Sequence, residues 1–191
     1  MPPLVDPEAA PPAESRRDRL LRRDSAATQA VARLPHPRWL TAPYGALSLS
    51  ANYGLLWFAV AAVPWLAGAS HGARTFVFVA GSVLVTEWIT YAVKLVVGRR
   101  RPAAVDPTLG GHIPLPRSHS FPSSHASMGM VGLLTMGSLY PAWIPALALL
   151  VALLCFSRVY LGVHYLLDVL AGVALGSVLG VLFVLLFRAL A

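Results

Sequence analysis

Cysteine is nearly absent from this chain of 191 residues. Cys155 is the only cysteine, and it lies inside an apolar run. A disulfide within the chain is therefore excluded, as is a metal cluster held by several cysteines. We expect the thiol to act as a small packing group.

Charge is also scarce, because only 12% of the residues are charged whereas 57% are hydrophobic. A typical soluble domain has about 25% charged residues, so an ordinary cytosolic globule is excluded. Lysine and arginine together number 15 against eight acidic residues, which gives a net charge of +7. Seven of the 14 arginines fall between Arg16 and Arg38, ahead of any long apolar run, and no basic face interleaved with aromatic residues follows. This pattern favours a membrane surface as the partner and no nucleic acid.

The N-terminal part of the chain divides into two segments. Residues 1–14 contain five prolines and no apolar run, which predicts a disordered tail. Residues 15–38 predict an amphipathic interfacial helix that begins at Ser15, a good N-cap. Its apolar stripe consists of Leu20, Ala27, Val31 and Leu34. The segment is too polar to cross a bilayer and is typical of a helix on an anionic membrane surface, with a partly disordered basic arm as the alternative.

Residues 39–191 predict one membrane-embedded domain. They contain five apolar runs, at residues 44–68, 75–97, 124–140, 143–160 and 164–187. Hydrocarbon about 30 Å thick requires about 20 helical residues, with about 17 to 25 tolerated. We therefore expect an all-α integral membrane bundle of about five transmembrane helices, preceded by the interfacial helix.

The arginine-rich segment before the first run predicts a multi-pass protein of the inner (plasma) membrane with a cytoplasmic N-terminus, because positive charge is retained on the cytoplasmic side. With five spans, the loop 98–121 and the turn 160–164 also face the cytoplasm. The loop 69–74 and the C-terminus face outward.

A first group of polar residues lies at the end of the second run. Lys94 is the only lysine, and Arg101 follows seven residues later, directly before Pro102. Seven residues are two helical turns, so the two cations share a face if the helix continues through Gly98. Two converging cations can clamp a doubly charged oxyanion. A basic stop-transfer cluster is the alternative.

A second group is FPSSHAS, residues 121–127, at the start of the third run. Pro122 and Ser123 begin a helix whose free backbone N–H groups and positive dipole end form an anion site. His125 then lies in the first turn, beside any anion that binds there. Plain N-capping is the alternative.

A third group is SRVYLGVHYLLD, residues 157–168. His164 and Asp168 are four residues apart, so their side chains meet on a helix, and the carboxylate holds one ring nitrogen while the other stays free as a nucleophile. Arg158 adds a third cation on the same membrane face. A structural His–Asp pair is the alternative.

Together the three groups predict one site at the inner ends of the helices. It combines a phosphate clamp of Lys94, Arg101 and Arg158 with an amide cradle and two histidines. This combination indicates phosphoryl transfer without a metal, in which three cations take the charge that Mg²⁺ would otherwise neutralise.

These residues resemble the signature of the type 2 phosphatidic acid phosphatase superfamily, the membrane lipid phosphatases related to bacterial acid phosphatases and vanadium haloperoxidases. The signature reads K-x₆-RP, then PSGH, then SR-x₅-H-x₃-D. The matching residues are Lys94, Arg101, Pro102, Pro122, Ser123, His125, Ser157, Arg158, His164 and Asp168. Ser124 stands where the signature has glycine; its Cβ narrows the pocket, and we expect activity to survive.

The resemblance implies a role for each residue. His164 is the nucleophile that forms a phosphohistidine, Asp168 orients it, and His125 is the general acid. The residues that bind the phosphoryl oxygens are Lys94, Arg101, Ser123, Ser124 and Arg158. Neither a metal nor another cofactor is implied.

The expected function is that of an integral-membrane lipid phosphatase. The candidate substrates are polyprenyl phosphates or diphosphates, phosphatidic acid, phosphatidylglycerol phosphate and a polyprenyl-phosphoryl phosphoribose. One alternative is a lipid phosphotransferase, which passes the phosphate from His164 to another lipid. A vanadate haloperoxidase is disfavoured because its substrate does not need five spans. A non-catalytic binder of anionic lipids, or an anion conductor, needs cations but no pair of histidines with a carboxylate.

Many membrane members of the family have six spans, whereas here a surface helix replaces the first. The charge rule then predicts an active site at the cytoplasmic face. Outside the signature, Glu87 is seven residues before Lys94 and is expected to form a buried polar tie, with tuning of Lys94 as the alternative. Three arginines are expected to bind headgroups or hold the topology, namely Arg99, Arg100 and Arg117.

Overall fold

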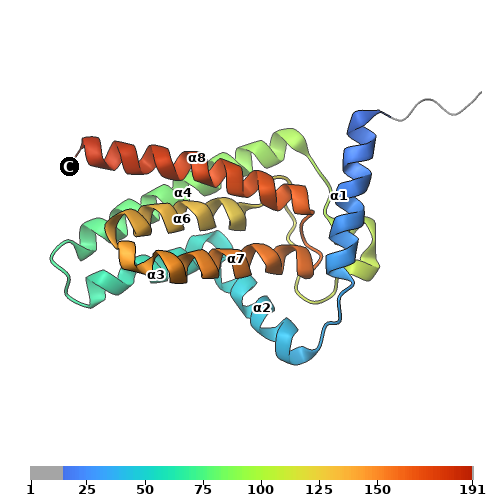
Figure 1. The fold of residues 1–191 in the computed structure, drawn as a ribbon, viewed down its shortest axis with the longest axis horizontal. Helices are drawn as coiled ribbons and strands as arrows, with labels where there is room; N and C mark the ends of the chain where they lie inside the picture. The colour runs from blue at the N-terminus through green and yellow to red at the C-terminus, as the bar shows by residue number, and fades with distance from the viewer. Residues whose placement is uncertain (1–14, 191) are drawn as a thin grey trace, which may run out of the picture.

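The computed structural model describes residues 15–190, so the predicted proline-rich tail of residues 1–14 lies outside the described residues. The elements in order are α1 (Arg16–Ala32), α2 (Arg38–Ser50), η1 (Asn52–Gly54), α3 (Leu55–Leu66), α4 (Gly72–Val97), α5 (Pro102–Val105), η2 (Pro107–Leu109), α6 (Ser124–Leu139), η3 (Pro141–Trp143), α7 (Ile144–Tyr160) and α8 (Leu166–Ala189). The described residues are helical with no strand, as predicted (Figure 1).

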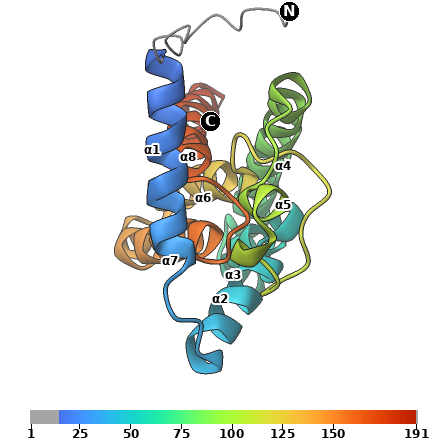
Figure 2. The ribbon, with the colours of Figure 1, turned by 90° about the vertical axis from the view of Figure 1, so that its right-hand side faces the viewer.

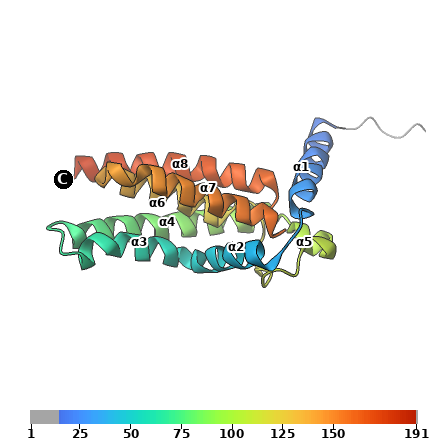
Figure 3. The same ribbon diagram turned by 60° about the horizontal axis from the view of Figure 1, so that its bottom comes forward.

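The long helices form a bundle with α6 at its centre. α6 packs against α4, α7 and α8, and α3 packs against α4. Figure 3 shows α3 and α4 along one side of the bundle and α6, α7 and α8 along the other. The core between them is apolar, and Trp57, Val83, Met128 and Val131 are almost completely buried. Gly132 on α6 leaves the space that the Trp57 ring fills.

The contact between α6 and α8 brings two backbones close together. A Cβ at Gly172 would lie 2.5 Å from the carbonyl oxygen of Ser123, and one at Gly176 would lie 2.3 Å from that of Ser127. Small residues four apart let membrane helices approach in this way. The start of α6, which carries the second group of polar residues, is therefore held directly against α8.

Large apolar side chains also cover the outside of the bundle. Trp88 and Val96 on α4 are 75% and 87% exposed, and Val178 on α8 is 60% exposed. An exposed apolar surface of this kind is typical of contact with lipid.

Within residues 15–190, three helical segments are long and apolar enough to cross a membrane, namely Gly72–Val105, Pro141–Tyr160 and Leu166–Ala189. A fourth is added if the bent pair Arg38–Ser50 and Asn52–Leu66 is one broken span. α6 has 16 residues, about 24 Å at 1.5 Å per residue. The predicted number of five spans stays a prediction.

The first apolar run, residues 44–68, is not one straight helix as expected. α2 and the segment that follows it meet at an angle of 61°. The break occurs because Tyr53 has a φ of 54° and Gly54 a φ of 82°, and a right-handed helix cannot continue through left-handed residues. The break brings the end of α2 to the polar groups at the start of α6.

α1 lies across one end of the bundle, next to the start of α8 and the end of α7 (Figure 2). Its apolar stripe does not pack as a whole, because Leu20 and Leu34 are 59% and 44% exposed. The face that packs instead carries Asp24, Thr28 and Ala32, which are buried. Packing against the polar end of the bundle selects small and hydrogen-bonding side chains, so the apolar pattern did not indicate this face.

Candidate active site

A small polar pocket lies at the end of the bundle that α1 covers. Its volume is about 100 Å³, and it is lined by Asn52, Tyr53, Glu87, Lys94, Arg101, Pro116, Ser118, Ser124, His125, Met128, Arg158 and His164. Sites for drug-sized ligands are typically about 300–1,000 Å³. The pocket therefore has room for a headgroup phosphate, while a lipid chain must lie outside it.

Lys94 and Arg101 converge on this pocket, but not along one helical face as predicted. α4 ends at Val97, and Gly98 caps it with a φ of 64°. A left-handed glycine is a common helix C-cap, and after it the chain is extended at Arg101. The turn at Gly98, and not helical periodicity, brings the second cation back over the first.

The loop before α6 holds both cations through its carbonyl oxygens. Lys94 Nζ donates to Pro122 O at 2.6 Å and to His119 O at 3.1 Å. Arg101 donates from Nε to Ser118 O at 2.9 Å and from Nη2 to His119 O at 3.2 Å. His119 thus orients both cations through its backbone carbonyl.

His164 lies in the loop between α7 and α8, directly beside Arg101. Its Nε2 is 3.0 Å from Arg101 Nη1, which also donates to Val163 O at 2.8 Å. On the other side of the ring, Nδ1 is 3.5 Å from Oδ2 of Asp168. Because a guanidinium only donates, Nε2 is the acceptor and the ring hydrogen is on Nδ1, facing the carboxylate. The lone pair of Nε2 is thereby directed to Arg101 Nη1, at the lining of the pocket.

The surroundings of His164 favour its neutral form. Burial and the neighbouring Arg158, Arg101 and Lys94 lower the pKa of this imidazole well below its usual value of 6.5. A low dielectric and nearby cations both disfavour imidazolium. A histidine that attacks phosphorus must be neutral, so this environment suits a nucleophile.

Asp168 fulfils two tasks at the start of α8. Oδ2 accepts a hydrogen bond from Tyr165 N at 2.9 Å as part of a capping box, the pattern that closes the first turn of a helix. His164 Nδ1 lies next to this carboxylate, but at 3.5 Å from Oδ2 it makes no hydrogen bond, and the histidine precedes the helix and does not lie on it. The backbone also joins the groups, since Ser123 N donates to Asp168 O at 3.0 Å.

The second histidine and the third cation share one partner that no sequence motif indicated. His125 Nε2 is 2.9 Å from Ser48 O, and Arg158 Nη1 donates to the hydroxyl of the same serine. Ser48 lies in the last turn of α2, just before the break at residues 51–54. Ser48 contacts His125 through its backbone carbonyl, and every residue has such a group. The residue type therefore could not indicate this contact.

Ser123 and Ser124 lie at the start of α6, as predicted. The Ser123 hydroxyl is buried without a hydrogen-bond partner, and Ser123 is not among the residues that line the pocket. Ser124, in the place of the signature glycine, lines the pocket. Glu87 also borders the pocket.

Arg99 corrects another expectation, that it binds headgroups or holds the topology. Its guanidinium makes ion pairs of 2.6 Å with both Asp24 and Asp168. Only 19% of its side chain is exposed, too little for a headgroup contact. Arg99 belongs to the polar network beneath His164.

The charges of the pocket are unbalanced. Lys94, Arg101 and Arg158 are all buried, and Glu87 is the single acidic residue among the lining residues. Buried charges are costly unless they are paired. The site is therefore complementary to a ligand with more than one negative charge.

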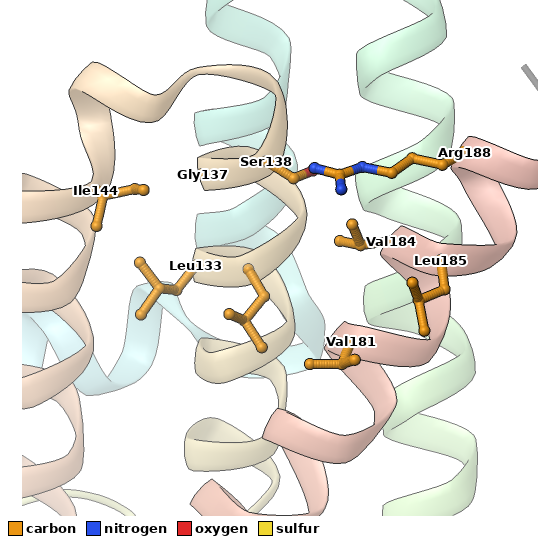
Figure 4. Close-up of a pocket in the computed structure, with 9 residues that line it drawn as sticks. Leu133, Gly137, Ser138, Ile144, Val181, Val184, Leu185 and Arg188 are labelled. Carbon is orange, nitrogen blue, oxygen red and sulfur yellow. The ribbon is translucent and has the colours of Figure 1, made fainter.

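A larger cavity of about 420 Å³ lies at the opposite end of α6 and α8 (Figure 4). Leucine and valine side chains dominate its lining, and Arg188 is the only ionisable residue there. It offers no nucleophile or acid, so the chemistry belongs to the smaller polar pocket. Within residues 15–190, no group of three or more histidine, cysteine or acidic side chains is arranged to hold a metal ion.

Comparison with known proteins gives the class to which this site belongs. The family model described as the PAP2 superfamily matches residues 75–190, which include every signature residue. The chain belongs to this superfamily of phosphatases.

Its individual relatives include two kinds of polyprenyl phosphate phosphatase. The decaprenylphosphoryl-5-phosphoribose phosphatase of Mycobacterium tuberculosis is 33% identical over 139 residues, which cover 69% of this chain and 76% of that protein. The undecaprenyl-diphosphatase of Sulfolobus acidocaldarius is 45% identical over 65 residues, which cover 34% of this chain and 32% of that protein.

Two solved structures have the same fold. The PAP2-type phosphatidylglycerolphosphate phosphatase of Bacillus subtilis has a TM-score of 0.71 at 22% identity, over 91% of this chain and 89% of that one. The LpxE protein of Aquifex aeolicus has a TM-score of 0.71 at 20% identity, over 83% of this chain and 93% of that one. At these identities the likeness shows the fold alone.

Proposed function

We propose that this protein is a lipid phosphatase that hydrolyses a phosphomonoester or diphosphate of a membrane lipid through a phosphohistidine on His164. One observation carries the proposal. Nε2 of His164, kept unprotonated by its contact with Arg101, borders a pocket in which three buried cations and a second histidine surround the space for one phosphate. Binding alone does not require a nucleophile held in one tautomer.

The reaction proceeds in two displacements. Nε2 of His164 attacks phosphorus, and the bond from phosphorus to the lipid oxygen breaks while His125 donates a proton to that oxygen. His125 then takes a proton from water, whose oxygen attacks the phosphohistidine and releases inorganic phosphate. Nε2 of His125 is occupied by Ser48 O, so the transferred proton is carried on Nδ1. Lys94, Arg101 and Arg158 stabilise the charge on the phosphoryl oxygens in both steps.

We further propose a polyprenyl-linked substrate, with a polyprenyl-phosphoryl phosphoribose as the first candidate. The names of the polyprenyl phosphatases among the relatives support this choice. The pocket lining adds support, because Asn52, Tyr53 and Glu87 offer uncharged and acidic hydrogen-bonding groups beside the cations. Such groups can bind the hydroxyls of a sugar next to the phosphate.

The test is phosphate release by the detergent-purified protein, with EDTA present. The panel contains polyprenyl phosphate, polyprenyl diphosphate, a polyprenyl-phosphoryl phosphoribose, phosphatidic acid and phosphatidylglycerol phosphate, and each is assayed alone. We expect release that is absent in His164→Ala and fastest with the phosphoribose lipid. Release from a single pure lipid distinguishes a hydrolase from a phosphotransferase, which needs a second lipid as acceptor. No release from any lipid by folded protein would contradict the proposal.

We also propose that the active site faces the cytoplasm from the inner membrane. The distribution of arginine supports this orientation. Arg74 and Arg188 are at the end of the bundle remote from the pocket, where Arg74 lies 4.8 Å from the ring of Phe187. The other twelve arginines belong to α1 and its C-cap, the start of α2, the segment 99–117 and the end of α7. Positive charge is retained on the cytoplasmic side.

A further inference from the structure

Asp24 is a buried carboxylate that no signature includes. It lies on the face of α1 that packs against the bundle, and it is only 5% exposed. Oδ2 pairs with Arg99 Nη2 at 2.6 Å, and Oδ1 accepts a hydrogen bond from Leu167 N at 2.9 Å. Both oxygens are therefore fixed, one by a cation and one by an amide in the first turn of α8.

Arg99 divides its guanidinium between two acids. Nη1 donates to Asp168 Oδ1 at 2.6 Å while Nη2 donates to Asp24. The guanidinium carbon lies 3.9 Å from the centre of the Tyr165 ring, which fixes the plane of the fork. An arginine fork commonly pairs with both oxygens of one carboxylate. Here the second acid prevents that arrangement.

This division determines what Asp168 offers to His164. Because only Oδ1 is paired with Arg99, Oδ2 is left to Tyr165 N at 2.9 Å and to Nδ1 of His164 at 3.5 Å. Without the charge of Asp24, Nη2 of Arg99 has no acid of its own. A bidentate pair of Arg99 with Asp168 would then draw Oδ2 away from the imidazole.

We propose that Asp24 is a positioning residue for the reaction, which acts through Arg99 to keep one oxygen of Asp168 directed to His164. This inference rests on the proposed function for its consequence in catalysis. It makes the N-terminal helix part of the enzyme's machinery, although α1 contributes no atom to the pocket.

Thr28 provides a matched control on the same helix. It is one turn after Asp24, it is completely buried, and its Oγ1 accepts a hydrogen bond from Leu166 N at 3.0 Å. It thus contacts the neighbouring amide of α8 but has no hydrogen bond to Arg99. Replacing Thr28 removes the same kind of helix contact without disturbing the acid pair.

The first experiment compares Asp24→Asn with Thr28→Val in the detergent-purified protein. Asparagine keeps an acceptor for Leu167 N and loses the charge and the acceptor that face Arg99. We expect kcat of Asp24→Asn to fall about 10- to 100-fold, the range that one charge-assisted hydrogen bond represents, with KM nearly unchanged. Thr28→Val should lower the Tm at least as much and leave kcat close to the wild-type value. Equal losses of kcat in the two variants would mean that Asp24 is only structural.

A double-variant cycle tests whether Asp24 acts through Arg99. If it does, Asp24→Asn in the background of Arg99→Gln causes no further loss of kcat, because the group it restrains is already gone. If the two losses multiply, the proposed route through Arg99 is wrong.

A last measurement is independent of turnover. In protein labelled with ¹⁵N at its six histidines, the chemical shifts report the tautomer of each ring, and His164→Asn assigns the signal. Because Arg101 keeps the Nδ1–H tautomer, we expect the ¹⁵N shift of His164 Nδ1 to move in Asp24→Asn, where this group loses its neighbouring carboxylate oxygen, but not in Thr28→Val. An unchanged Nδ1 shift in Asp24→Asn would overturn the inference. Wild-type protein that releases no phosphate would instead contradict the proposed function, and the Nδ1 shift would still test the inference.

Discussion

The two histidines of the pocket have different partners, and those partners separate their tasks. His164 lies between a guanidinium and a carboxylate, which fix its tautomer. His125 is held by the carbonyl oxygen of Ser48, and that contact leaves the ring free to take up and release a proton at its other nitrogen. These contacts suit the proposed roles of His164 as the nucleophile and His125 as the general acid.

Replacing each histidine by alanine should therefore have a different result. His125→Ala should lower kcat about 10²- to 10⁴-fold, the usual contribution of a general acid, and inorganic phosphate should still inhibit because the cations remain. His164→Ala should have no measurable turnover, since the covalent route is lost. His71→Ala, at an exposed histidine outside the pocket, is the control and should match the wild type. The rate of phosphate release is measured for the three variants with and without added inorganic phosphate. Equal residual rates in His125→Ala and His164→Ala would contradict the different roles proposed for the two histidines.

The stability of the protein should depend on pH through His164. The pKa of this buried group is lowered in the folded protein, while the unfolded chain takes up the proton near pH 6.5. Below that pH the unfolded state binds more protons, so the folded protein loses up to about 1.4 kcal/mol per pH unit until the folded pKa is reached.

This prediction is measured as Tm from pH 8 to pH 5 for the wild type and for His164→Asn, whose side chain does not titrate. The wild type should lose Tm more steeply below pH 6.5, and the two curves should be parallel above it. Parallel curves over the whole range would show that His164 is not buried in its neutral form.

The sequence predicted those pocket residues that act through their side chains. Lys94, Arg101, His125, Arg158 and His164 were all assigned from spacing, and all of them line the one pocket. Ser48 was missed because a carbonyl oxygen belongs to every residue. Asp24 was missed because its partners lie 75 and 143 positions away, far beyond any helical period.

At the level of elements, hydropathy located the helices well. The predicted runs 124–140 and 143–160 agree with α6 (Ser124–Leu139) and α7 (Ile144–Tyr160) to within a residue. The break between α2 and α3 was not predicted, because leucine, tyrosine and alanine keep the run apolar on both sides of it. Only the left-handed backbone at residues 53 and 54 interrupts the helix, and apolar composition does not report backbone conformation.

The seam between α6 and α8 leads to a prediction about packing. Gly176→Ala places a methyl group 2.3 Å from the carbonyl oxygen of Ser127, a contact that only a shift of the helices relieves. We expect about 1–3 kcal/mol of destabilisation, typical of overpacking, and lower activity because α6 carries His125. Gly81→Ala on α4 is the control, since a Cβ there meets open space. Thermal unfolding and phosphate release are measured for both variants. Equally small effects of Gly176→Ala and Gly81→Ala would mean that α6 and α8 can move apart at little cost.

For the whole molecule, the uneven distribution of arginine makes the orientation testable. After Cys155→Ser removes the native thiol, a cysteine is introduced at exposed Ala104, beside the pocket, or at exposed Ser70, at the opposite end. In intact spheroplasts a membrane-impermeant maleimide should label the cysteine of Ser70→Cys and spare that of Ala104→Cys until the membrane is opened. Labelling of Ala104→Cys in sealed spheroplasts would reverse the proposed orientation.

The pairing of α1 with α8 also has a consequence for synthesis. The hydrogen bond from Leu167 to Asp24 joins positions 143 apart, an interval that a ribosome takes roughly 7–29 s to translate. Throughout that time Asp24 has no partner from α8, and neither the Asp168 carboxylate nor the His164 imidazole exists. The catalytic groups thus assemble only when nearly the whole described chain has been made, so an unfinished chain at the membrane cannot hydrolyse the lipids around it.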